Sequence, residues 1–321
     1  MPVDIVGIGY PVMDCLLSIP RIPAPNSGVG LLEQSWQGGG MIATGLATAS
    51  TLGASAGIYG IAGDDQYGHF CRRDLASNGV DTSHLLTDSN KSTFISFVLC
   101  AKETKSRSFI GKQGSHRRLS ADELDDEYIL GAKYLFVTAM DEASVAACKL
   151  AKANKIKTFI DANAYDDRTM SHLGLIDYLV GSEDFYMGAL NQKPYNEGCR
   201  ILSGAGPETV VITLGESGCV YLSGGVYKEA PSYNVEVIDT CGAGDVYHGA
   251  FLYALTKNWD IDRTVSFSSA VAAISCTRLG GRAGIPTAAV AERFMETGEI
   301  DYSQIDKRVE MYRKGVMAQP D

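Results

Sequence analysis

The stretch Asp239-Thr240-Cys241-Gly242-Ala243-Gly244-Asp245 decides the fold of this chain of 321 residues. It follows an apolar run at 235–238 that predicts a strand, and it precedes a helical pattern in which apolar residues recur three and four positions apart. Two glycines at such a junction let backbone N–H groups converge on an anion, and the helix N-terminus adds the positive end of its dipole. We therefore expect an anion hole formed by the N–H groups of Gly242, Ala243 and Gly244.

Asp245 lies beside this predicted anion hole, where a carboxylate would repel a bound phosphate. A carboxylate is useful in that place if it takes up a proton, so the combination predicts phosphoryl transfer to a hydroxyl group, with Asp245 as the general base. An aspartate in the first turn of a helix is also a common capping residue. The glycines that precede Asp245 favour the catalytic interpretation over the capping one.

The stretch resembles the C-terminal signature of the ribokinase-like (PfkB) carbohydrate kinases. Three more segments resemble motifs of that family in the same order, namely Gly38-Gly39-Gly40 with the residues up to Ala54, Gly63-Asp64-Asp65, and Thr213-Leu214-Gly215 with Gly218. The resemblance runs from about residue 3 to residue 286. It implies an ATP-dependent phosphotransferase that moves the γ-phosphate to a hydroxyl of a sugar or sugar derivative.

The pattern of apolar segments predicts an α/β fold. After Gly114, apolar strands alternate with amphipathic helices, which is typical of a largely parallel sheet covered on both faces. Together with the resemblance, this predicts a three-layer α/β/α domain over residues 1–321. Lid segments at about 14–37 and 91–112 are expected to form a small β-sheet over the sugar site. The resemblance and the exposed apolar residues of this sheet predict a homodimer that pairs through the lid.

The resemblance also implies the positions of the substrates. Asp14 follows the first strand and corresponds to an aspartate that bonds sugar hydroxyls, and Gly39 and Gly40 allow the backbone to approach the sugar. Thr44 stands where the family usually has an asparagine, so a hydroxyl replaces an amide there. The nucleotide is expected beside Thr213, Gly215, Gly218 and Cys276.

Two cations are implied in the same way. Mg²⁺ is needed to neutralise ATP, but the family motif that organises it is altered, with Ser182 in place of the usual asparagine and Phe185 in place of the usual glutamate. Glu183 or Asp184 could substitute. A K⁺ site is expected beside the anion hole, formed by Asp239, Cys241, Ser275 and Gly280.

Thr44 and the segment Ser182-Glu183-Asp184-Phe185 are similar to the branch of the family that contains sulfofructose kinase. An anionic sugar needs a cationic partner, and Arg107 in the second lid segment is the candidate for that role. The alternative interpretation of Arg107 is a solvated charge within a polar strand.

Composition narrows the class of function. A net charge of −10 argues against nucleic acid and against an anionic membrane surface as partners. No apolar run approaches the roughly 20 residues that span a bilayer, and the eight cysteines form no C-x-x-C pair. The five histidines are isolated, without the spacing of metal ligands. We expect a cytoplasmic enzyme with reduced thiols.

Two alternatives to a sugar kinase remain open at the level of the sequence. A nucleoside kinase of the same fold would need an apolar, aromatic lid. A non-catalytic relative that binds sugar as a regulatory or interaction protein would be compatible with the altered magnesium motif, although the retention of Asp245 and its glycines argues against it.

Overall fold

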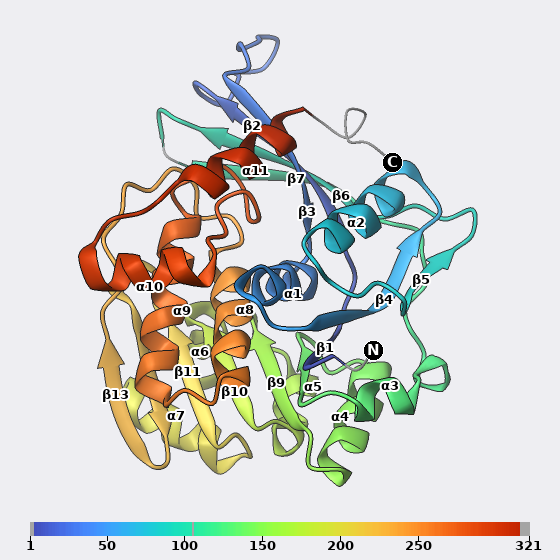
Figure 1. Ribbon diagram of the computed structural model, residues 1–321, viewed down its shortest axis with the longest axis vertical. Coiled ribbons are helices and arrows are strands. Elements are labelled where there is room, and N and C mark those ends of the chain that lie inside the picture. Colours follow the sequence, from blue (N-terminus) through green and yellow to red (C-terminus); the bar gives the residue numbers. More distant parts are fainter. Residues whose placement is uncertain (1–2, 105, 315–321) are drawn as a thin grey trace.

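A nine-stranded sheet and a smaller four-stranded sheet organise the structure, a computed structural model that describes residues 3–104 and 106–314 (Figure 1). The large sheet has the order β13-β12-β11-β10-β9-β8-β1-β4-β5. Its strands, in chain order, are β1 Ile5–Ile8, β4 Ala56–Gly63, β5 Leu85–Asp88, β8 Tyr134–Val137, β9 Lys157–Ala162, β10 Tyr178–Ser182, β11 Thr209–Thr213, β12 Cys219–Ser223 and β13 Val226–Ala230. Neighbouring strands pair in parallel except β11 with β12 and β12 with β13, which are antiparallel.

Helices cover both faces of this sheet, and the apolar residues of its parallel strands are buried accordingly. One core lies under α1 Met41–Leu52, α8 Ala243–Thr256, α9 Ile261–Ser275, α10 Ala288–Thr297 and α11 Ser303–Arg313. The core on the opposite face lies under α3 Asp126–Leu130, α4 Glu142–Ala153, α6 Glu183–Leu190 and α7 Tyr195–Gly204. The remaining helices are α2 Gln66–Ser77 and α5 Asp167–Ser171. The fold is therefore the three-layer α/β/α arrangement expected from the sequence.

The small sheet forms the lid. Its strands are β2 Val12–Ile19, β3 Glu33–Gly39, β6 Ile95–Ala101 and β7 Ser106–Lys112, in the order β3-β2-β6-β7. The β2 and β6 strands are parallel, and the other two pairings are antiparallel. These strands lie within or across the predicted lid segments 14–37 and 91–112. Residues 1–2 and 315–321 of the predicted domain, and residue 105 of the second segment, lie outside the described residues.

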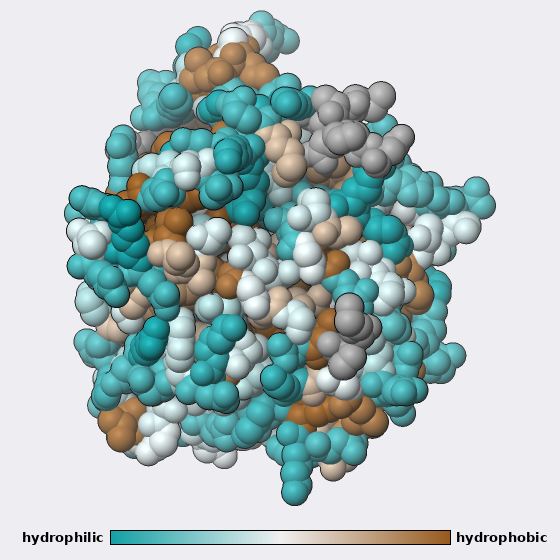
Figure 2. Space-filling model, viewed as in Figure 1, coloured by the Kyte–Doolittle hydropathy of each residue, from teal (hydrophilic) through white to brown (hydrophobic). Residues whose placement is uncertain are grey.

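Apolar side chains remain exposed on the lid. Figure 2 shows apolar surface at the top of the view, over the part of the lid that projects from the body. All seven residues of β7 are exposed. The exposed large apolar side chains of the lid segments are Ile22, Leu31, Leu32, Phe109 and Ile110.

One strand expected from the sequence is absent. The apolar run at 235–238, immediately before the glycine-rich stretch, is not a strand, and Val237 and Ile238 are more than half exposed, at 56% and 59%. The segment leaves the edge of the sheet after β13 and crosses towards α8, tied by the N–H of Ile238 to the carbonyl of Cys276 at 2.8 Å. The prediction was wrong because apolar residues can also line a ligand cavity, and Val235 and Val237 do so.

A buried arginine joins the lid to the body. Arg282 is 0% exposed and forms an ion pair with Asp74 of α2. Its guanidinium also donates to the carbonyl of Gly39 in β3 at 3.0 Å, and its backbone N–H donates to the Gln37 side chain at 2.8 Å. Asp74 in turn accepts a hydrogen bond from Tyr312 of α11 at 2.7 Å. Strand β3 is thereby fixed to elements far apart in the sequence.

Among the described residues, no helix is both long enough and apolar enough to cross a membrane.

Candidate active site

The glycine-rich stretch forms the turn that begins α8. Gly242 precedes the helix with φ of 71°, in the left-handed region that favours glycine. A Cβ atom at Gly242 would lie 2.7 Å from the Cα of Gly281, so two chain segments meet here at backbone distance. Within the turn, the N–H of Ala243 donates to the carbonyl of Thr240 at 3.3 Å. The turn therefore has the geometry of a helix-entry anion site, with the Ala243 N–H partly engaged inside it.

Asp245 lies in the first turn of α8 and is partly buried. Burial raises the pKa of its carboxyl group, and the nearby carboxylates of Asp161 and Asp14 raise it further, whereas Arg282 acts in the opposite direction. A raised pKa makes Asp245 a stronger base when it is ionised.

Asp14 and the glycines of β3 come together at one end of the lid. Gly39 lies so close to Asp14 that a Cβ atom there would be 2.0 Å from the Asp14 Oδ2 atom. Gly40 has φ of 91° and precedes α1. Burial raises the pKa of Asp14 to about 6, with Arg282 lowering it and Asp239 raising it. The carboxylate of Asp14 also raises the pKa of Asp245.

Thr44 lies in α1 and is 2% exposed. Its hydroxyl accepts a hydrogen bond from the Arg282 Nε atom at 3.3 Å. This side chain is therefore part of the network that joins the lid to the body.

Arg107, Cys241 and Gly280 meet at Asp239, whereas Ser275 makes no contact with Asp239 among the described interactions. The Asp239 side chain is 1% exposed and accepts hydrogen bonds from the N–H of Cys241 at 3.0 Å and from the N–H of Gly280 at 2.9 Å. Arg107 reaches it from lid strand β7, with 3.8 Å between Nη1 and Oδ1. The Ser275 carbonyl packs closely against Gly284 in the same part of the chain. Burial raises the pKa of the Cys241 thiol, so this cysteine stays protonated.

A cavity of about 790 Å³ opens on the other side of the glycine-rich turn. Thr213, Gly215, Gly218 and Cys276 all line it, so the structure brings together the four residues predicted to contact the nucleotide. Thr240, Ala243 and Gly244 also line it. The cavity therefore reaches the predicted anion hole.

The altered magnesium motif lies at the end of β10 and the start of α6. The Ser182 hydroxyl donates to the carbonyl of Asn163 at 2.7 Å and accepts from the N–H of Phe185 at 3.1 Å, and Phe185 is fully buried. Glu183 accepts a hydrogen bond from Tyr195 at 2.8 Å. Asp184 is exposed in the first turn of α6. Its carboxylate is the kind of hard oxygen donor that fits Mg²⁺, bound directly or through water.

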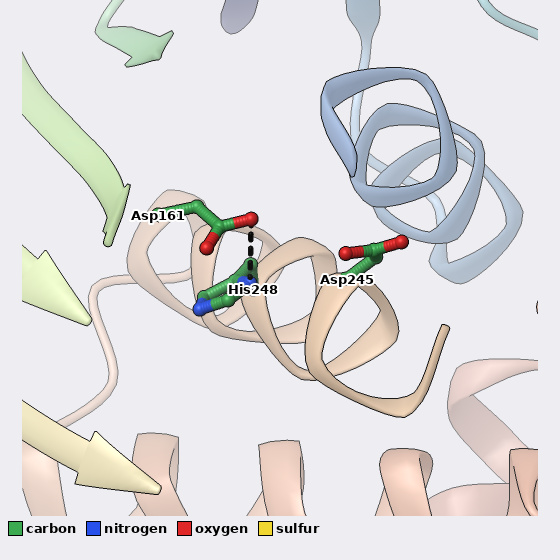
Figure 3. Close-up of side chains that lie close together, drawn as sticks. All are labelled: Asp161, Asp245 and His248. Carbon is green, nitrogen blue, oxygen red and sulfur yellow. Dashed lines mark ion pairs between the residues drawn. The ribbon is translucent and has the colours of Figure 1, made fainter. Parts of the chain in front are cut away.

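One further group beside Asp245 was not predicted from the sequence. Asp161 of β9 and His248 of α8 are 2% and 5% exposed, and their nearest polar atoms, Oδ2 and Nδ1, are 3.4 Å apart. Figure 3 shows Asp161 and His248 next to Asp245. One side-chain nitrogen or oxygen atom from each of the three residues lies within 4.8 Å of the other two. Asp161 lies in strand β9, 84 positions before Asp245 of helix α8, so only the fold reveals the contact. The position of His248 one turn after Asp245 was the available signal.

Comparison with known proteins identifies the family. A family model for the pfkB family of carbohydrate kinases matches residues 12–288. The chain belongs to this family, and it is a carbohydrate kinase, a phosphate-transferring enzyme.

Relatives cover most of the chain. A ribokinase of Haemophilus influenzae is 28% identical over 295 residues, which are 88% of this chain and 95% of the ribokinase. A 5-dehydro-2-deoxygluconokinase of Shouchella clausii is 30% identical over 271 residues, 77% of this chain and 83% of that protein. An Escherichia coli protein provisionally assigned as ribokinase II, solved with ATP and Mg²⁺, has a TM-score of 0.80 at 22% identity and covers 92% of this chain and 99% of its own.

The close approach at Gly242 gives a testable prediction. Gly242→Ala adds a Cβ against the Gly281 backbone in addition to strain at positive φ, so the turn has to shift. We expect a loss of at least about 100-fold in kcat, the effect of removing one well-placed N–H donor. Steady-state kinetics measures this loss.

Gly298→Ala is the matched control. Gly298 has φ of 72°, almost the value at Gly242, but a Cβ there meets no atom within 4 Å. This variant carries the same backbone strain and should keep the wild-type kcat. Equal kinetics for the two variants would contradict a special role for the Gly242 turn.

Proposed function

We propose that this kinase transfers the γ-phosphoryl group of ATP to a hydroxyl of a sugar or sugar derivative, with Asp245 as general base. The observation that supports this most directly is the position of Asp245, in the helix turn whose residues Ala243 and Gly244 line the 790 Å³ cavity. Asp14 lies in lid strand β2, and its carboxylate raises the pKa of Asp245. A sugar between Asp14 and Asp245 would lie next to the terminal phosphate of a nucleotide in the cavity.

The proposed reaction follows from these positions. Asp245 takes the proton of the sugar hydroxyl as its oxygen attacks the γ-phosphorus, and the bond from that phosphorus to the bridging oxygen breaks to release ADP. The N–H groups at 242–244 and the dipole of α8 stabilise the charge on the transferred group. Mg²⁺, when bound with ATP, neutralises phosphate charge, and Asp184 is the residue that we propose holds it.

The lid excludes water from this reaction. We propose that residues 1–321 form one kinase domain, in which the lid segments close over the sugar and suppress hydrolysis of ATP. The exposed apolar residues of the lid support pairing with a second copy. A mass in sedimentation equilibrium near the 34.3 kDa of one chain would contradict that dimer.

A cytoplasmic location is proposed because ATP is available there and all eight cysteines are free.

The base assignment predicts the effect of one substitution. Asp245→Asn keeps the size of the side chain but removes its ability to take a proton, so we expect sugar-dependent ADP release to fall by about 10²–10⁴-fold. The assay uses ATP and Mg²⁺ with ribose, fructose, ketodeoxygluconate, sulfofructose, sugar phosphates and nucleosides. Loss of turnover with retained binding of ATP supports the proposal.

Three outcomes would contradict the proposal in different ways. Turnover retained in Asp245→Asn would remove Asp245 as the base. A wild-type enzyme that turns over nucleosides alone would indicate a nucleoside kinase. Binding of a sugar without turnover in the wild-type protein would indicate a regulatory or interaction protein.

We further propose that the sugar is anionic, as in the sulfofructose kinase branch of the family. Arg107 supports this because it extends from the lid to within 3.8 Å of Asp239, beside the glycine-rich turn, while its side chain stays 34% exposed. A guanidinium in that position can pair with a sulfonate, carboxylate or phosphate on the substrate.

Arg107→Ala then has a selective effect. We expect the KM for the sugar to rise at least tenfold, because a charge-assisted contact is lost, and the KM for ATP to change by less than about twofold. Arg118→Ala is the control, since Arg118 is 79% exposed and its carboxylate partner, at 3.8 Å, is Asp141 and not Asp239. An unchanged sugar KM in Arg107→Ala would remove Arg107 from the sugar site.

We also propose a K⁺ site at Asp239, Cys241, Ser275 and Gly280. The buried Asp239 carboxylate and the converging backbone of the 275–284 segment support it. A monovalent cation there would stabilise the glycine-rich turn electrostatically, so the rate should rise with KCl and not with an equal concentration of tetramethylammonium chloride. A flat response to potassium would contradict the site.

A further inference from the structure

Asp161 and His248 are ionisable side chains buried in an apolar environment at the centre of the large sheet. Asp161 lies near the carboxyl end of β9, where its register partner on β10 is Val180. The ring of His248 packs edge-on against Phe159, with 6.0 Å between ring centroids. Among the described residues, neither nitrogen of His248 nor the Oδ2 atom of Asp161 has a hydrogen-bond partner that meets ordinary geometry. Such burial is costly and needs a physical reason.

Asp161 and His248 lie beside Asp245. His248 follows Asp245 by three residues on the same helix, so both side chains lie on one face of α8. Asp161 closes the group from β9, with the three side chains within 4.8 Å of one another (Figure 3). Burial lowers the pKa of His248 to about 3, although the backbone of Val180 close to the ring raises it, so the ring is neutral and carries one N–H. A small adjustment of the 3.4 Å separation would let Nδ1–H donate to Asp161. Burial raises the pKa of Asp161 to about 7, and this donated hydrogen bond would favour its ionised form.

We propose that Asp161 and His248 form a positioning pair in which the neutral His248 ring donates its Nδ1–H to Asp161 and the Asp161 carboxylate strengthens Asp245 as the general base. The inference rests on the proposed function of Asp245. Neither Asp161 nor His248 touches the reacting atoms. Their role is to set the charge and orientation of the carboxylate that does.

The electrostatic effect has a definite sign. Burial is the largest cause of the raised pKa of Asp245, and the charge of Asp161 is the next largest. The other charged groups that face Asp245 are Asp14 from β2 and Arg282 from the loop before α10, and the protonated thiol of Cys241 lies just before α8. Because the pKa of Asp245 is raised, acidification removes its ionised, active form at a higher pH than for an ordinary aspartate. Removing the charge of Asp161 should therefore extend activity to lower pH while weakening the base.

Asp161→Asn tests this sign in the full-length enzyme. We expect the acid limb of the kcat/KM profile to move down by roughly one to two pH units. We expect kcat at neutral pH to fall at least tenfold and the KM for ATP to stay within about twofold, because the weaker base affects only the chemical step. An acid limb that superimposes on that of the wild type would overturn the proposal.

A pair of substitutions at His248 keeps the proposal testable if Asp161→Asn does not fold. The amide nitrogen of Asn can stand near the position of His Nδ1, whereas Leu has no donor. His248→Asn should keep kcat within about threefold of the wild type, and His248→Leu should lose at least tenfold at similar thermal stability. Equal kcat in the two variants, or a loss that follows thermal stability alone, would overturn the role of the N–H donor.

Two controls separate this inference from its alternatives. Asp245→Asn, measured in parallel, tests whether Asp245 is the base. If Asp245→Asn is inactive but the kcat/KM profile of Asp161→Asn does not shift with pH, the role of the Asp161–His248 pair is contradicted and the base assignment stands. Elemental analysis of the purified enzyme tests whether a metal ion occupies the group. Stoichiometric metal that is lost in His248→Leu would overturn the proposal, because Asp161 and His248 would then be ligands.

Discussion

The buried guanidinium of Arg282 is the constraint on which the rest of the structure depends. It is fully enclosed, and it neutralises Asp74 while bonding the carbonyl of Gly39 and the hydroxyl of Thr44. Removing one member of a buried ion pair typically costs about 3–5 kcal/mol because the remaining charge stays unpaired. Arg282 therefore holds helix α2, lid strand β3 and helix α1 in one arrangement. The backbone immediately before Arg282, at Gly281, is the surface against which Gly242 packs.

Buried acids gather around this arginine. Asp14, Asp239 and Asp245 approach the glycine-rich turn from the lid, from the segment before α8 and from α8 itself, and Asp161 stands behind them. So much negative charge would repel ATP unless part of it is neutralised by Arg282 and Arg107, by protonation or by bound cations. Asp239 is satisfied by two N–H donors and Arg107. Of the carboxylates that surround the glycine-rich turn, Asp239 is thereby the one whose charge is compensated by direct partners.

Local patterns in the sequence predicted most of the elements. Strand β8 and helix α4 belong to the alternation of apolar strands and amphipathic helices that was predicted after Gly114, and Asp and Asn caps mark the ends of α4. The glycine-rich turn was also foreseeable, because the positive φ at Gly242 requires glycine. The run at 235–238 was misjudged because apolar residues that line a cavity have the same pattern as a strand. The contacts of Arg282 with Asp74 and of Asp161 with His248 span 208 and 87 positions, and no local pattern encodes them.

The departures from the usual family pattern are explained better by packing than by loss of activity. Thr44, in the place of the usual asparagine, is buried and accepts from Arg282, so its side chain serves the same network that fixes Gly39 next to Asp14. Ser182 caps α6 and bonds the end of β9, and Phe185 fills the core beneath it. Each replacement is compatible with an intact site because the groups closest to the proposed chemistry, Asp245 and the backbone at 242–244, are unaltered. Under the proposed function, the lid is the part that sets substrate choice, and Arg107 adds a charge there beside Asp239.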